Sequence, residues 1–75
     1  MLAMSCLPLG RQGIVHSVAG GGLSRRRLLD LGLVPGTRVE ALRRSPSGDP
    51  TAYAIRGAVI ALRTEEANNV QIYLP

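Results

Sequence analysis

The sequence lacks several residue types, and each absence excludes a class of function. It has no Phe, no Trp and only two Tyr, so it lacks the aromatic walls that bind polyproline peptides or stack on single-stranded nucleic acid. Cys6 is the single cysteine, which excludes an internal disulfide, a Cys-x-x-Cys metal site and a redox pair. Since a free thiol is typical of a reducing compartment, we expect a cytoplasmic protein.

Long apolar runs are also missing. No stretch approaches the roughly 18 to 20 consecutive apolar residues that cross a bilayer, so we expect a soluble chain without membrane insertion. The apolar first nine residues carry no basic segment and no small-residue cleavage site, which argues against a secretory signal. A length of 75 residues has room for one domain, placed at residues 1–75, with a thin aliphatic core.

The residues of a catalytic site are absent as well. The chain has one His and one Cys, its acids are scattered, and no Ser-His-Asp, Walker or dinucleotide-binding pattern occurs. Gly20-Gly21-Gly22 precedes a helical segment, where an anion could bind, but the Lys-Ser/Thr end of a phosphate-binding loop is missing. We therefore predict no catalytic residue, no enzymatic activity and no small-molecule substrate.

All nine basic residues are arginines, and they exceed the five acidic residues by four charges. This balance suits nucleic acid, anionic lipid or an acidic protein surface, and it does not choose between them. Arginine favours bidentate contacts with carboxylate or phosphate. The missing aromatic residues argue against nucleic acid as the partner.

The middle of the chain predicts a short helix followed by a turn. Ser24 is a suitable N-cap, Leu28 and Leu31 lie on one helical face, Gly32 suits the left-handed position after the helix, and Pro35-Gly36 suits the centre of a type II turn. A helix of two turns is not stable alone in water. We therefore expect its leucines to pack against β-structure on either side.

Alternating apolar residues predict about five short strands. The predicted strands cover residues 12–19, 37–44, 51–56, 58–63 and 70–74. Gly57 supplies a tight hairpin between the third and fourth of them, and Thr64 is expected to cap one helical turn before the last. Short strands with turns between them, and one helix inserted after the first strand, predict a mainly β fold that closes into a small barrel.

The charges on the predicted helix are unfavourable for its stability. Arg25, Arg26 and Arg27 crowd the first turn, where the helix dipole disfavours cations by roughly 0.3–1 kcal/mol each. An ion pair between Arg26 and Asp30 would recover only about 0.2–0.5 kcal/mol. Two interpretations stay open: a solvated face that tolerates the penalty, or a surface that leaves its guanidinium groups free for an acidic partner.

Four segments in order resemble the FeoA family of ferrous iron transport proteins. They are Leu7–Gly13 (LPLGRQG), Arg27–Thr37 (RLLDLGLVPGT), Arg44–Pro50 (RSPSGDP) and Ile55–Arg63 (IRGAVIALR). The resemblance implies an SH3-like β-barrel with a helical insertion. It also implies a cytoplasmic accessory or regulatory protein for ferrous iron uptake, which binds the FeoB membrane permease and lies at the inner membrane through that partner.

For this partner we predict contacts through Arg25, Arg26, Leu29 and Pro35, because the helix and the Pro-Gly turn present them together. Leu29 lies well off the face that Leu28 and Leu31 share. Two alternatives remain: a metal-responsive regulatory module like the SH3-like C-terminal domain of iron-dependent repressors, and a small nucleic-acid-binding barrel.

A closed transition-metal site uses about four N, S or O donors, and the potential metal ligands in this sequence are few and widely spaced. The candidates are Cys6, His16, Asp30, Asp49, Glu65 and Glu66. We therefore predict no required cofactor. Adventitious Fe²⁺ or Zn²⁺ would bind between molecules, with His16, Glu65 or Glu66 as donors. Residues 70–74, as an edge strand, would allow a homodimer.

Overall fold

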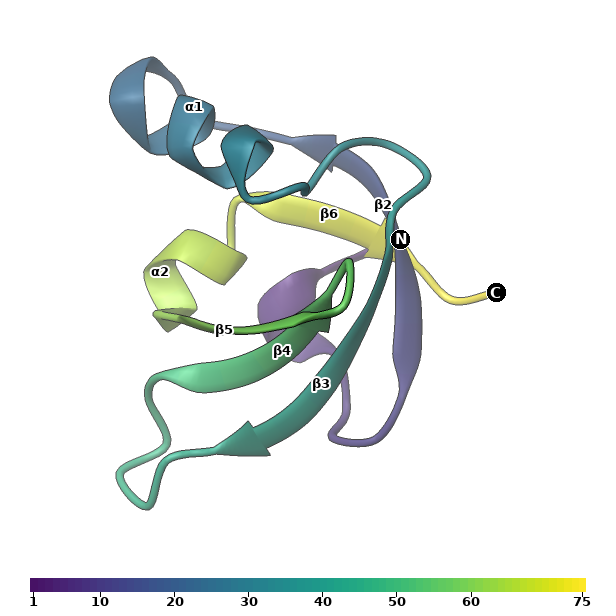
Figure 1. Cartoon of the computed structure of the whole chain (residues 1–75), viewed down its shortest axis with the longest axis vertical. Helices are drawn as coiled ribbons and strands as arrows, with labels where there is room; N and C mark the ends of the chain where they lie inside the picture. The colour runs from purple at the N-terminus through teal and green to yellow at the C-terminus, as the bar shows by residue number, and fades with distance from the viewer.

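Six strands form one antiparallel sheet in a computed structural model that describes all 75 residues (Figure 1). In chain order the elements are β1 (Leu2–Ala3), the 3₁₀ helix η1 (Met4–Cys6), β2 (Gln12–Val18), α1 (Gly22–Asp30), β3 (Arg38–Arg44), β4 (Thr51–Ile55), β5 (Ala58–Leu62), α2 (Thr64–Ala67) and β6 (Val70–Tyr73). The strand order in the sheet is β1-β6-β2-β3-β4-β5. The predicted mainly β fold with a short helical insertion is confirmed.

The predicted closure of the sheet is wrong. β1 and β5 stand at opposite ends of the strand order and do not pair with each other. β1 has only two residues before η1 begins, so it offers too few backbone groups to form a ladder with a second neighbour. The predicted edge at residues 70–74 is also wrong, because β6 pairs with β1 on one side and β2 on the other. A dimer through β6 would have no free strand edge to use.

The helix α1 begins three residues earlier than predicted and ends as predicted. Gly21 occupies the N-cap position with extended backbone (φ −154°, ψ 177°) and no side-chain cap, so the prediction of Ser24 as N-cap is wrong. At the other end Gly32 has φ 102°. Its N–H donates to the Leu29 carbonyl at 3.0 Å, and the Leu33 N–H donates to the Leu28 carbonyl at 3.2 Å. This pattern is the Schellman motif, which a glycine after the helix favours.

The Pro35-Gly36 turn is attached directly to the sheet. The Thr37 N–H donates to the Val34 carbonyl at 3.0 Å, and Gly36 has φ 92°, as the predicted turn requires. The Gly36 N–H then donates to the Val15 carbonyl at 2.8 Å. The turn is therefore held against β2.

The second helix, α2, starts differently from the prediction. Thr64 is its first helical residue, and Arg63 occupies the N-cap position. The Arg63 backbone N–H donates to Glu66 Oε1 at 3.0 Å, whereas the Thr64 N–H donates to Asp49 Oδ1 at 2.9 Å. Asp49, from the β3–β4 loop, thus accepts a hydrogen bond from the N–H of the first helical residue. The prediction that Thr64 is the cap of this helix is wrong.

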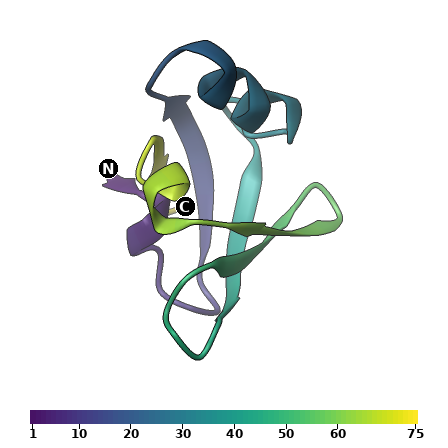
Figure 2. The same ribbon diagram turned by 90° about the vertical axis from the view of Figure 1, so that its left-hand side faces the viewer.

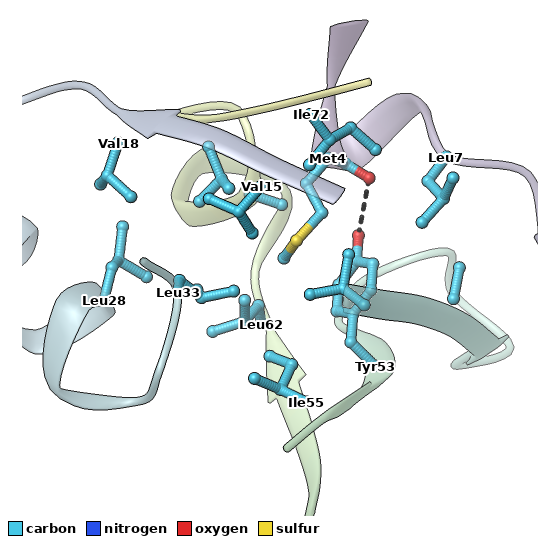
Figure 3. Packing of buried hydrophobic residues seen from close by; sticks show 14 residues of the cluster. Met4, Leu7, Val15, Val18, Leu28, Leu33, Tyr53, Ile55, Leu62 and Ile72 are labelled. Carbon is cyan, nitrogen blue, oxygen red and sulfur yellow. Dashed lines mark hydrogen bonds between the residues drawn. The ribbon is translucent and has the colours of Figure 1, made fainter. Parts of the chain in front are cut away.

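Fourteen buried apolar residues form one core between the sheet and its two helices (Figure 3). α1 contributes Leu28 to it, and Leu33 follows directly after the helix. Tyr53 is the only buried aromatic residue, and its hydroxyl donates to the Met4 carbonyl at 3.4 Å (Figure 3). Burial raises the pKa of the Tyr53 phenol, so its hydroxyl keeps its proton to a higher pH than a phenol in water.

Candidate docking surface

The candidate docking surface consists of α1 and the Pro35-Gly36 turn, at one end of the molecule (Figure 1). Leu28 faces the core, and Leu29 is half-buried and packs against it. Leu23 is 88% exposed and is the leucine that this surface presents most fully. The sequence prediction missed Leu23 because it began the helix after Ser24.

Two of the helix arginines are bonded to other parts of the chain. Arg25 Nε donates to the Val18 carbonyl at the end of β2, at 3.2 Å. Arg27 forms an ion pair with Glu66 of α2. These bonds tie α1 to β2 and α2, which offsets part of the unfavourable position of cations in the first turn. Arg25 and Arg27 therefore do not stand free.

The predicted ion pair between Arg26 and Asp30 is present, with Nε and Oδ1 3.5 Å apart. Both side chains are largely exposed, at 76% and 68%. Exposed pairs of this kind stabilise a fold by about 0–1 kcal/mol. Arg26 therefore stays accessible on the surface, and a partner carboxylate can replace Asp30 at low cost.

A hollow lies beside the turn. Its lining residues are Val34, Pro35, Gly36, Thr37, Arg38 and Arg56. Arg38 and Arg56 lie one step beyond the Val39–Ile55 pair of β3 and β4, so both lie at the same end of this strand pair. Neither arginine forms an ion pair. Arg38 Nη1 donates to Gln12 Oε1 at 3.1 Å.

Arg56 occupies an unfavourable backbone position. It has φ 52°, and with Gly57 at φ 81° it forms the two-residue loop between β4 and β5, a type I′ turn in which Asn, Asp or Gly is usual. Left-handed backbone costs an ordinary L-residue roughly 1–2 kcal/mol. The hairpin turn at Gly57 was predicted from the sequence, but no role was predicted for Arg56. The signal was an arginine directly before Gly57, at a loop position where Asn, Asp or Gly is usual.

The Arg56 side chain lies across Gly32 at the C-terminal end of α1. A Cβ at Gly32 would stand 2.7 Å from Arg56 Cδ, so only glycine leaves room for this arrangement. Figure 2 shows the β4–β5 hairpin, in light green, projecting beneath α1. The negative end of the helix dipole favours a cation there.

The predicted metal donors do not come together in one molecule. His16 is exposed on β2, with Nδ1 3.2 Å from Ser17 Oγ. Glu66 is paired with Arg27, and Glu65 is exposed on α2. No three His, Cys, Asp or Glu side chains form a group that could hold a metal ion. A single chain thus lacks the donor set of a closed transition-metal site.

Neither α1, with nine residues, nor α2, with four, has the length and apolar composition to traverse a bilayer. The open antiparallel sheet with a two-turn helix between β2 and β3 defines a small SH3-like β module. The FeoA domain family matches residues 2–74. The chain belongs to the FeoA family.

Three known proteins illustrate the relationship. Over 73 residues the chain is 32% identical to the Fe(2+) transport protein A/Fe(2+) transporter FeoB fusion protein of Porphyromonas gingivalis; the match covers 97% of this chain and 9% of the fusion protein. The FeoA protein of Chlorobium tepidum is 37% identical, with a TM-score of 0.89 over 97% of this chain and 70% of that chain. Stenotrophomonas maltophilia FeoA complexed with zinc, described as a prokaryotic SH3 domain protein, is 32% identical, with a TM-score of 0.86 over 96% of this chain and 89% of that chain.

Proposed function

We propose that this protein is an accessory or regulatory protein of ferrous iron uptake and acts by binding a FeoB-type iron permease. The observation that carries the proposal is the Porphyromonas gingivalis fusion protein, which joins a segment similar to nearly this whole chain with a FeoB transporter. Fusion holds two modules at high effective concentration. Such a link is useful when one module acts on the other.

The docking surface supplies the means of binding. Arg26 and Pro35, two of the four predicted contacts, are exposed and offer a cation and a rigid apolar ring. Arg25 holds the end of β2, and Leu29 packs against the core, so we assign these two residues to shaping the surface. Leu23 takes the place of Leu29 as the apolar contact.

The role we propose is non-enzymatic and cytoplasmic, with the protein held at the inner membrane by the permease. Ferrous iron is the cargo of the permease in this scheme and does not need a site in this chain. A transition metal such as the zinc of Stenotrophomonas maltophilia FeoA would bind here between molecules, with His16, Glu65 or Glu66 as donors. The bound metal would then cross-link copies of the chain.

A binding assay with the immobilised cytoplasmic and membrane portions of the permease tests this function. We expect the wild type to bind, and Arg26→Glu and Leu23→Asp to weaken binding about ten-fold, which corresponds to about 1.4 kcal/mol. Arg11→Glu is the matched control, because it makes the same charge change in the loop before β2, at the other end of the molecule (Figure 1).

Two outcomes would contradict the proposal. If the wild type does not bind any portion of the permease, the proposed function is wrong. If the helix variants and Arg11→Glu bind as the wild type does, the interface lies outside α1. Circular dichroism of each variant verifies that the fold is retained, since both altered side chains are exposed.

A further inference from the structure

We propose that the hollow between Arg38 and Arg56 binds a carboxylate of an acidic peptide segment in a partner protein. The proposal rests on the proposed function for the identity of that partner, the permease. The carboxylate site itself rests on three observations of this chain: the charges, the backbone of Arg56 and the lining of the hollow.

The first observation is that two arginines without an ion pair line the same hollow. Like charges that lie close together repel, and Arg38 and Arg56 both follow the last pair of the β3–β4 ladder, Val39 and Ile55, and line the same hollow. The arginines Arg26, Arg27 and Arg63 each pair with an acid of the chain. Because Arg38 and Arg56 have no acid of their own, an anion from outside relieves their repulsion.

The second observation is that Arg56 occupies a backbone position that disfavours arginine. Its φ of 52° suits Asn or Gly better, and its aliphatic stem packs over Gly32, where a Cβ would be 2.7 Å from Cδ. Strained residues that persist in a fold cluster at functional sites. The planar guanidinium fork of Arg56 matches a carboxylate.

The third observation concerns the walls of the hollow, which favour a peptide over nucleic acid or lipid. Val34 and Pro35 line it beside the two arginines, so an apolar side chain next to the acid finds a surface to cover. No Phe, Trp or Tyr lines the hollow, so bases have nothing to stack on. An acidic segment that also carries apolar residues fits this combination.

The decisive variant is Arg56→Asn. Asparagine is preferred at this loop position, so we expect Tm to rise by about 4–8 °C while peptide binding weakens. Binding is followed by NMR titration of the full chain with a synthetic peptide in which glutamates alternate with leucines. The Nε–H signals of Arg38 and Arg56 should shift, and affinity should fall about ten-fold in Arg56→Asn and in Arg38→Gln.

Three controls define the site. The same peptide with glutamine in place of glutamate should not shift these signals, inorganic phosphate should bind more weakly than the glutamate peptide, and Arg11→Gln should bind the peptide as the wild type does. Unchanged peptide affinity in a stabilised Arg56→Asn protein would overturn the proposal. Phosphate binding that matches or exceeds peptide binding would overturn the assignment to an acidic peptide.

A binding measurement with the permease, on the wild type and on Arg56→Asn, distinguishes this proposal from the proposed function. If the permease binds the wild type and Arg56→Asn equally, the hollow is not the carboxylate site, and the proposed function stands. If the glutamate peptide binds at the hollow but the permease does not bind the wild type, the proposed function fails, and the carboxylate site stands with another acidic partner.

Discussion

At the scale of single residues, Tyr53 makes the stability of the fold depend on pH in the alkaline range. Burial raises the pKa of its phenol, whereas an unfolded chain ionises tyrosine near pH 10. Below that pH the phenol is protonated in both states. Above it the unfolded state loses the proton first, so the free energy of unfolding falls as pH rises from about 10 through the folded-state pKa.

Tyr53→Phe should flatten this decline and cost about 0.5–1.5 kcal/mol at neutral pH for the lost hydrogen bond. Denaturant melts at several alkaline pH values measure both effects. Tyr73→Phe is the control, because Tyr73 is exposed and its replacement should leave the decline unchanged. A decline in Tyr53→Phe as steep as that of the wild type would show that another group is responsible.

Gly13 of β2 lies against the Ile72 side chain of the neighbouring strand β6. A Cβ at Gly13 would stand 2.7 Å from Ile72 Cδ1, and Ile72 is completely buried. We expect Gly13→Ala to destabilise the fold by about 1–3 kcal/mol through overpacking. Chemical denaturation measures the change. Adding Ile72→Val removes Cδ1, so Gly13→Ala should cost less in that background; equal costs would rule out this contact as the cause.

Short-range features of single residues were predictable from the sequence, and distant partners were not. The Gly32 cap, the Gly57 turn and the Arg26–Asp30 pair each depend on residues within a few positions of one another. The Arg27 partner, Glu66, lies 39 positions away in the sequence, and only the folded arrangement brings it near. For the same reason the sequence did not predict that Arg27 is paired within the chain.

At the scale of elements, α1 has an unfilled cap. Gly21 provides no side-chain oxygen, and the first turn contains no acid. Gly21→Asp should stabilise the protein by about 0.5–1 kcal/mol, because the carboxylate caps backbone N–H groups and opposes the helix dipole. Thermal unfolding measures this gain. Gly21→Asn supplies the cap without the charge and should give a smaller gain; no gain from either variant would contradict an N-cap at Gly21.

Most strands could be predicted because their apolar alternation is local, but their arrangement in the sheet could not. The five predicted strands match β2 to β6 to within one residue at each end. β1 was missed because Leu2–Ala3 is too short to show a period. The predicted sheet edge at residues 70–74 was wrong because β1, from the other end of the chain, pairs with β6. The predicted closure of the sheet was wrong because β1 and β5 do not pair.

At the scale of the whole molecule, the resemblance of four segments predicted the family correctly, whereas the carboxylate hollow was missed. Arg38 begins β3, and Arg56 lies in the β4–β5 loop. Their proximity follows from the register of β3 on β4, which no local pattern reveals. Pro35 was predicted as a contact from its turn alone, and it lies in the same hollow.

The distribution of donors over the whole molecule also predicts how it responds to metal. Because no three potential ligands gather in one chain, we expect no tight one-to-one binding of Fe²⁺ or Zn²⁺. Sedimentation with excess Zn²⁺ should instead reveal metal-linked dimers, since two chains together can supply the donors that one lacks. His16→Ala should abolish these dimers, whereas Cys6→Ser should retain them. Tight stoichiometric metal binding to a monomer in calorimetry would refute this prediction, because it would require a donor set that the fold does not assemble.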